Sequence, residues 1–283
     1  MMAFSNDQVG NFYDATTMLW EKYWGEHLHH GYYDPHVSIQ EQNDRQAQVL
    51  LIDKMIEWAH LQTCHHFLDV GCGVGGSSLE LVKRFGGNTT GIGISLSSYQ
   101  VQRAESKSRS MGYGKQLKFL IADALNMPFP DHCFDLVWSL ESAEHMADKT
   151  QFLRECYRVL QPQGRLIMAT WCHRQTEQKP LTNYEQNHLQ RIYSAYCLPW
   201  VISLQNYYDL AQELGFQNIQ IADWTREVAP FWHKVWQSAL TPQALLDIIK
   251  VGLPAIRGAL TVRLMIRGYA MGLLKFGLLT AVK

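Results

Sequence analysis

The sequence predicts an α/β protein built around one doubly wound, mostly parallel β-sheet. Between residues 65 and 171, short apolar runs alternate with segments whose apolar residues recur at helical spacing. A glycine-rich turn, "GCGVGG", joins the first apolar run to a helical segment, an arrangement common in nucleotide-binding sheets. Hydrophobic residues make up 47% of the chain and charged residues 18%, which is enough apolar material for a large buried core.

Each helix or strand is predicted from the spacing of its apolar residues and from the residues that typically begin or end such an element. Helices are expected at 41–61, 77–85, 98–113 and 149–164, the last ending at Pro162 and Gly164. Ser77 or Ser78 is expected near the N-cap of the second helix. Buried strands are expected at 65–70, 88–95, 117–125, 134–140 and 164–171. Right-handed crossovers between these strands then fix the topology.

The alternation breaks twice in the C-terminal part of the chain. Residues 173–199 are polar and aromatic and are predicted to form an insertion. A helix at 203–216 and a strand at 218–225 follow. A second insertion covers about 230–274, and the chain ends in a strand-like run at 275–283.

Charge and cysteine usage narrow the class of protein. Lys plus Arg number 25 and Asp plus Glu number 26, so a net charge of −1 gives no bulk attraction to nucleic acid. The six cysteines form no C-x-x-C pair, which argues against a zinc ribbon or a redox dithiol and fits a reducing compartment. No signal peptide or membrane-spanning run is visible. A cytoplasmic location is therefore expected, and the oligomeric state stays open.

The stretch "DVGCGVGG" lies where such a sheet binds a nucleotide-like ligand, outside the carboxyl ends of the strands. Gly71, Gly73 and Gly76 satisfy G-x-G-x-x-G, so a dehydrogenase that uses NAD is one candidate. Asp69 argues against it, because a carboxylate close to the first glycine would repel a pyrophosphate but would suit a cationic ligand. The alternative is that Asp69 only caps the turn.

The residues at the ends of the second and third strands also argue against NAD. The second strand ends in "GIGIS" without the acid that grips a ribose in dinucleotide sites, whereas the third ends in Asp123, placed for an adenine amino group. An acid before the glycines and one after the third strand is the layout of a class I S-adenosylmethionine methyltransferase.

Several longer stretches resemble one family in particular, the γ-tocopherol methyltransferases together with their plant relatives that methylate indole-alkaloid nitrogens. The matching stretches are "FYDATTMLWEKYWGEHLHHGYYDP", "DVGCGVGGSS", "ADALNMPF", "FDLVWSLESAEHM", "TWCHR", "ADWTREVAPFW" and "GALTVRLMIRGYAMGLLKFG". The last three lie outside the general methyltransferase core, so the resemblance is specific.

The resemblance implies a single structural domain with a Rossmann-like sheet, an antiparallel last strand and helical lid insertions. It divides the chain into an N-terminal helical arm and cofactor cover (1–62), an S-adenosylmethionine-binding core (63–173), and the rest of the core (174–283) with acceptor-binding insertions at 174–200 and 230–274. The implied cofactor residues are His29, Asp69, Gly71, Cys72, Gly73, Gly75, Ser95, Leu96, Gln100, Ala122, Asp123, Ala124 and Ser139.

The window "EHLHHGYYDPH" holds four histidines, and H-x-H-H can bind a metal ion. Methyl transfer from a sulfonium needs no metal, however, and no Cys or Glu elsewhere has ligand spacing, so no metal site is predicted. By resemblance this window covers the cofactor, with His29 and His30 lining the cofactor or the acceptor. For His27 and His36 a polar loop is an equally good interpretation.

"LESAEHM" follows the fourth strand and places Glu141, Glu144 and His145 beside the expected methyl group. These three and His30 are the predicted catalytic residues, because a histidine near carboxylates can take up a proton. For Glu144 the alternative is a helix-terminal acid that answers the helix dipole.

The two insertions predict the kind of acceptor. They are rich in large apolar side chains, namely Tyr193, Tyr196, Leu198, Trp200, Phe231, Trp232 and Trp236. A bulky hydrophobic aromatic molecule is therefore expected, with a tocopherol-type chromanol methylated on ring carbon as the first candidate and an indole-alkaloid-like amine as the alternative. The span 248–283 has six basic residues and no acid, which predicts either peripheral contact with a membrane or a solvated lid face.

Overall fold

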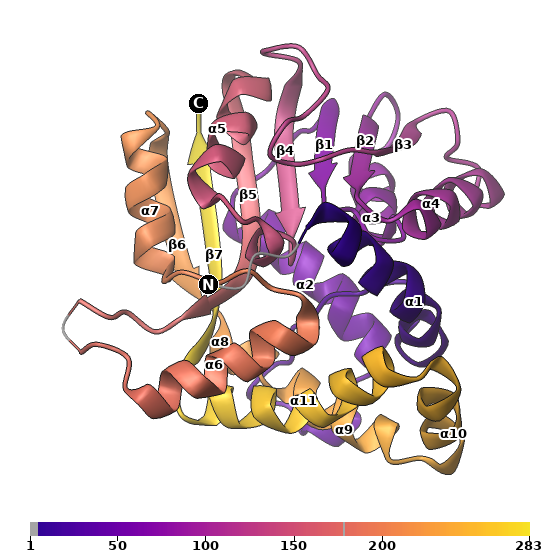
Figure 1. The fold of residues 1–283 in the computed structure, drawn as a ribbon. Coiled ribbons are helices and arrows are strands. Elements are labelled where there is room, and N and C mark those ends of the chain that lie inside the picture. Colours follow the sequence, from indigo (N-terminus) through magenta and orange to yellow (C-terminus); the bar gives the residue numbers. More distant parts are fainter. Residues whose placement is uncertain (1–4, 178) are drawn as a thin grey trace.

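The predicted sheet is confirmed by a computed structural model, which describes residues 5–177 and 179–283. Seven strands form one sheet in the order β3-β2-β1-β4-β5-β7-β6 (Figure 1). Their bounds are β1 (His66–Val70), β2 (Thr90–Ser95), β3 (Leu117–Ile121), β4 (Phe134–Leu140), β5 (Leu160–His173), β6 (Gln217–Asp223) and β7 (Leu274–Val282). β1 to β5 pair in parallel, and β7 lies antiparallel between β5 and β6.

Helices α2, α3 and α4 pack on one face of this sheet, and α5 and α7 pack on the other. The described helices are α1 (Asn6–Trp24), α2 (Asp44–Trp58), α3 (Gly76–Phe85), α4 (Ser98–Ser110), α5 (Lys149–Val159), α6 (Asn183–Tyr196), α7 (Leu204–Glu213), α8 (Thr225–Val228), α9 (Pro230–Ala239), α10 (Pro242–Val251) and α11 (Leu253–Ala270), with short 3₁₀ turns η1 (Ile39–Glu41) and η2 (Ala143–His145). Alternate residues of one strand face opposite cores. Phe67 packs with α2, α3 and α4, whereas its neighbour Leu68 packs with α5 and α7.

Three predicted boundaries are wrong, each for a local reason. α3 begins after Gly75, which has a left-handed backbone (φ 81°), and not after Ser77 or Ser78, because the glycine loop turns the chain before the serines. α5 ends at Val159, and the residues predicted to end it belong to the long strand β5. β3 ends at Ile121, because Asp123 Oδ1 accepts a hydrogen bond from the Leu125 N–H and forms a turn.

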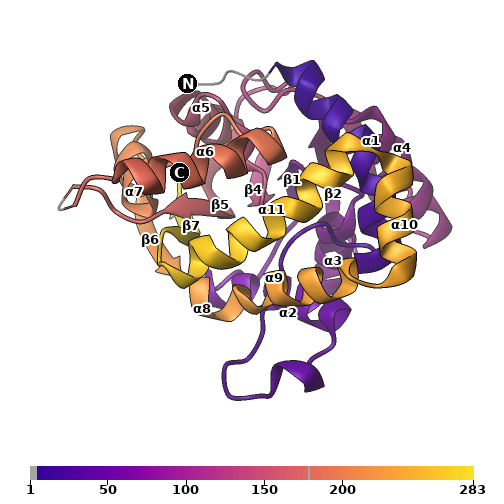
Figure 2. The ribbon, with the colours of Figure 1, turned by 60° about the horizontal axis from the view of Figure 1, so that its bottom comes forward.

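The remaining helices form a cap beyond the carboxyl ends of the parallel strands. In Figures 1 and 2, α6, α9 and α11 lie across this edge of the sheet, and α1 lies beside α10. α1 begins with a capping box in which Ser5 and Gln8 exchange hydrogen bonds. Within the described residues, no helix combines the length and the hydropathy needed to cross a bilayer. Helix α1 covers the ends of β1, β2 and β4, where the functional residues gather.

Candidate active site

A cavity of about 140 Å³, called here the cofactor cavity, lies at the carboxyl ends of β1, β2 and β4. This is the point where the strand order reverses, at which open α/β sheets bind their ligands. The glycine loop forms one wall, with Gly71 at φ 78° and Gly73 at φ 53°. A Cβ on Gly71 would lie 2.2 Å from the Ser142 Cβ, so only glycine fits between the loop and the turn after β4.

Most of the predicted cofactor residues line this cavity. They are His29, Gly71, Cys72, Gly73, Ser95, Leu96, Gln100, Ala122, Asp123 and Ala124. Its lining carboxylates are Glu26, Asp123 and Glu141, and no Lys or Arg is found among its described lining residues. Such a wall suits a ligand with a sulfonium and an ammonium group, and it would repel the pyrophosphate of a dinucleotide.

Three predicted cofactor residues do not line the cavity. Asp69 is buried near the end of β1 and accepts a 2.6 Å hydrogen bond from Ser78 Oγ, which joins β1 to α3 on the other side of the glycine loop. Burial raises the pKa of Asp69 to about 7, against the lowering effect of that bond. Gly75 packs against Phe119, and Ser139 Oγ is hydrogen-bonded to Ser142 Oγ.

Helix α1 closes the cavity with three residues that were not predicted to be site residues. Asn6, Val9 and Tyr13 line it, and their spacing of three and four places them on one helix face. Asn6 Nδ2 donates to Asp123 Oδ2 at 2.8 Å, and Tyr13 Oη bonds His145 Nε2 at 2.7 Å. The helical spacing of these three residues was the feature of the sequence from which their common helix face could have been predicted.

The histidine window lies between α1 and the glycine loop. The rings of His27 and His29 are 5.0 Å apart, with His29 Nε2 3.1 Å from His27 Nδ1. Burial lowers the pKa of His27 to about 2 and also lowers that of His29, so both imidazoles are neutral. His27 is therefore a buried cavity residue and not part of a polar loop, whereas His36 is exposed. Over the described ranges, no group of three or more His, Cys, Asp or Glu side chains is placed to hold a metal ion.

His30 and Glu141 form a buried pair between the cofactor cavity and the helical cap. The carboxylate accepts hydrogen bonds from the His30 N–H and from His30 Nδ1, both at 2.6 Å, and from Trp171 Nε1 at 3.0 Å. Burial alone would raise the pKa of Glu141, but His30 holds it below its ordinary value, so the carboxylate is ionised. His30 Nδ1 is then the donor of this bond, and in the neutral tautomer with the proton on Nδ1 the other nitrogen, Nε2, is an acceptor. This buried Nε2 has no hydrogen-bond partner in the described part of the chain.

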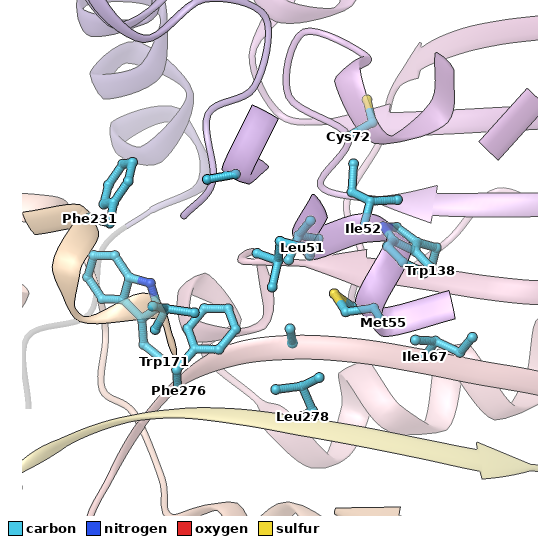
Figure 3. Packing of buried hydrophobic residues seen from close by; sticks show 14 of the residues in the cluster. Leu51, Ile52, Met55, Cys72, Trp138, Ile167, Trp171, Phe231, Phe276 and Leu278 are labelled. Atoms are coloured by element: carbon cyan, nitrogen blue, oxygen red, sulfur yellow. The ribbon is translucent and has the colours of Figure 1, made fainter. Parts of the chain in front are cut away.

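Aromatic rings from β5, β7 and the cap surround His30. Its imidazole lies 4.6 to 6.2 Å, between ring centroids, from five of them. Together with Tyr196, whose ring is 5.5 Å from that of Trp171, these residues are called the aromatic cage. Its members are His30, Trp171, Tyr196, Phe231, Trp232, Tyr269 and Phe276. In Figure 3, Trp171, Phe231 and Phe276 lie together, away from Trp138.

The other two predicted catalytic residues have different environments. His145 lines the cofactor cavity, and burial lowers its pKa to about 3, so it is a neutral and weak base. Glu144 does not line the cavity and accepts a 2.7 Å hydrogen bond from Thr170 Oγ1. Burial raises the pKa of Glu144 to about 8, with Glu141 adding to the shift. The structure thus brings Glu141 and His145 to one wall of the cavity and places Glu144 behind it.

The sheet order, the glycine loop at the switch point and the acidic covered cavity define a class I S-adenosylmethionine-dependent methyltransferase. Residues 68–168 match the family described as "Methyltransferase domain". The chain is 42% identical to the Arabidopsis thaliana protein named tocopherol O-methyltransferase, chloroplastic, over 97% of this chain and 81% of that one. It therefore belongs to the tocopherol O-methyltransferase family, and its cofactor is S-adenosylmethionine.

Two further relatives extend this comparison. A Synechocystis protein named 2-methyl-6-phytyl-1,4-hydroquinone methyltransferase is 35% identical over 99% of this chain and 88% of its own. A Rauvolfia serpentina protein named norajmaline N-methyltransferase is 31% identical over 100% of this chain and 99% of its own. The chain is thus similar along its whole length to enzymes named for phenolic and for amine acceptors, and its own acceptor is a small molecule.

Proposed function

We propose that this enzyme methylates a ring carbon of a tocopherol-type chromanol. The observation that carries the proposal is the buried His30–Glu141 pair, in which Nε2 has no partner among the described residues and the imidazole lies within the aromatic cage, next to the cofactor cavity that Glu141 lines. A cage of this kind suits a flat aromatic acceptor. The relatives named for tocopherol and for a phytyl hydroquinone support the same class.

In this mechanism His30 removes the phenolic proton. A phenol has a pKa of about 10, and its ring carbons become strong nucleophiles only when the oxygen gives up or shares the proton. Nε2 accepts that proton, and the ionised Glu141 on Nδ1 stabilises the imidazolium that forms. When bound, S-adenosylmethionine would supply an electrophilic methyl group on its sulfonium. The hydrogen of the methylated ring carbon leaves as a proton when the ring regains its aromaticity, and the imidazolium returns its proton to the phenolic oxygen.

We assign the cofactor side of the site to the loop and to α1. The backbone of the glycine loop would hold the cofactor, and Asp123, after the end of β3, would accept a hydrogen bond from its adenine amino group. Tyr13 and His145 hold α1 over the cavity through their hydrogen bond, which excludes water from the reaction.

The first prediction concerns the acceptor itself. With labelled S-adenosylmethionine, we expect methyl transfer to γ-chromanols, with mass spectra that place the new methyl on ring carbon. A panel of indole alkaloids is the comparison, because the Rauvolfia relative is named for an amine acceptor. Labelling of the amines with none of the chromanols would replace the present proposal by N-methylation.

We also propose that α10 and α11 contact a membrane, which would bring the enzyme to an apolar acceptor. Leu246, Ile249 and Leu260 are between 55 and 67% exposed, and Lys250 and Arg263 on the same helices are exposed bases. Apolar and basic side chains together suit an anionic bilayer surface.

The six cysteines are all free, which supports a reducing compartment such as the cytoplasm.

A vesicle assay tests this membrane contact. We expect the protein to sediment with vesicles that contain anionic lipid and to lose this binding in a Leu246→Glu/Ile249→Glu variant. Leu120→Glu is the matched control, since Leu120 is an exposed apolar residue on β3. Equal binding by all three proteins would show that α10 is only a solvated lid face.

A further inference from the structure

We infer that a second cavity, between α1 and the helices α9 to α11, binds the long aliphatic tail of the acceptor. This inference rests on the proposed function, because the tail belongs to the same molecule as the methylated ring. The cavity, called here the helical cavity, has a volume of about 80 Å³. Its walls include Trp20 and Trp24 from α1, Val235 from α9, Ile248 from α10 and Val262 from α11.

The chemistry of the walls selects an uncharged, apolar occupant. None of the described residues that line the cavity carries a charge. The hydroxyls of Thr16 and Ser238 donate to backbone oxygens of their own helices, at 2.8 and 2.9 Å, so neither is left to solvate a polar ligand. An aliphatic chain loses only its hydration on entering such a site, and each buried methylene contributes about 0.8 kcal/mol.

Small residues give the cavity its width. Ala239, Ala244 and Gly258 contribute no bulk to its walls. A Cβ built on Gly258 would meet no atom of the described residues within 4 Å, although close packing is the rule between helices. Because Gly258 lines the helical cavity, a larger side chain at this position would occupy part of the cavity.

The inner end of the helical cavity adjoins the reaction site. Tyr196 lines this cavity, and its ring lies 5.5 Å from Trp171 and 6.1 Å from Trp232 of the aromatic cage. The buried Tyr196 Oη has no hydrogen-bond partner among the described residues, so it is available to an oxygen on the ring of the acceptor. A tail in the helical cavity thus ends at Tyr196, whose ring contacts the cage around His30.

An ion pair closes the outer side of the helical cavity. Asp247 on α10 accepts hydrogen bonds from Lys22 and, at 2.8 Å, from Tyr23 Oη, both on α1. These bonds join the two helices that form opposite walls. The neighbouring Leu246 and Ile249 are exposed, so opening this ion pair would admit a tail from the same face that we propose meets the membrane.

The test fills the cavity by Gly258→Leu and compares two acceptors, a chromanol with its full tail and the same chromanol without it. We expect KM for the tailed acceptor to rise by at least about tenfold, the loss expected from about two methylenes that are no longer buried. We expect kcat/KM for the tailless acceptor to stay unchanged. Gly258 lies inside α11, so leucine also favours the helix. Leu260→Ala, an exposed position on α11, is the control.

A binding measurement separates failure of this inference from failure of the proposed function. Calorimetry with phytol alone requires no methyl transfer, and binding of S-adenosylhomocysteine reports whether the fold is intact. We expect the wild type to bind phytol and Gly258→Leu to lose that binding, even if no chromanol is a substrate. Equal kinetic changes for both acceptors, or phytol binding unaffected by Gly258→Leu, would overturn the inference.

Discussion

Replacing His30 by asparagine is expected to lower kcat on a chromanol by about 10²- to 10⁴-fold, the usual loss when a general base is removed. The asparagine amide can still donate to Glu141 from the position of Nδ1, but it has no acceptor nitrogen in the place of Nε2. The affinity for S-adenosylhomocysteine should change little, because His30 does not line the cofactor cavity. Steady-state kinetics together with calorimetry measure both quantities.

The pH dependence distinguishes a lost base from a damaged site. As pH rises toward the phenol pKa of about 10, the substrate ionises unaided, so His30→Asn should recover part of its rate. The wild type should gain less over the same range. Glu141→Gln is a positioning variant: it weakens the stabilisation of imidazolium, and its rate loss should also shrink with rising pH.

His145→Ala is the comparison that can contradict this assignment. His145 is the other histidine that the sequence places beside the methyl group, but its pKa of about 3 makes it a poor acceptor for a phenolic proton. We expect this variant to lose affinity for the cofactor through the broken bond to Tyr13, with a smaller change in kcat. Full activity of His30→Asn combined with a 10²-fold loss in His145→Ala would make His145 the base.

The sheet was predictable because its signals are local. Strand 134–140 and helix 98–113 are recognised from their own residues, and the glycine loop marks the switch point. The partner of Asp69 was not predictable in the same way. The charge of Asp69 predicted a ligand contact, and the structure shows that its carboxylate accepts a hydrogen bond from Ser78, nine residues away.

The acceptor side of the site was harder to predict from the sequence, because it is built from contacts between distant parts of the chain. His30 and Glu141 are separated by 111 residues, and the pair appears only when the histidine window folds over the end of β4. Glu141 also takes a left-handed backbone (φ 54°), which no periodic pattern predicts and which aims its carboxylate at His30. The insertions indicated an aromatic acceptor by composition, but only the packing separates the cage from the helical cavity.

Gly71→Ala is expected to lower the free energy of unfolding by about 2 to 4 kcal/mol, combining overpacking with the cost of a left-handed Cβ. The added methyl would lie 2.2 Å from the Ser142 Cβ. Ser142 cannot retreat freely, since its Oγ donates to the Val70 carbonyl at 2.6 Å. Because Ser142 directly follows Glu141, the same displacement should also disturb the His30 pair, so affinity for S-adenosylhomocysteine and kcat should both fall. Urea denaturation, calorimetry and kinetics measure these three effects.

Two companion variants isolate the clash between the glycine loop and the turn after β4. Gly112→Ala has the same kind of backbone (φ 87°) but no atom within 4 Å of the new Cβ, so it carries only the left-handed cost and should leave activity intact. In Gly71→Ala/Ser142→Gly the opposing Cβ is absent, and the double variant should be more stable than the sum of the two single changes by about 1 kcal/mol or more. Strict additivity would mean that Gly71 and Ser142 do not oppose each other. The loop would then act on the cofactor alone, without the steric contact through which it also positions Glu141.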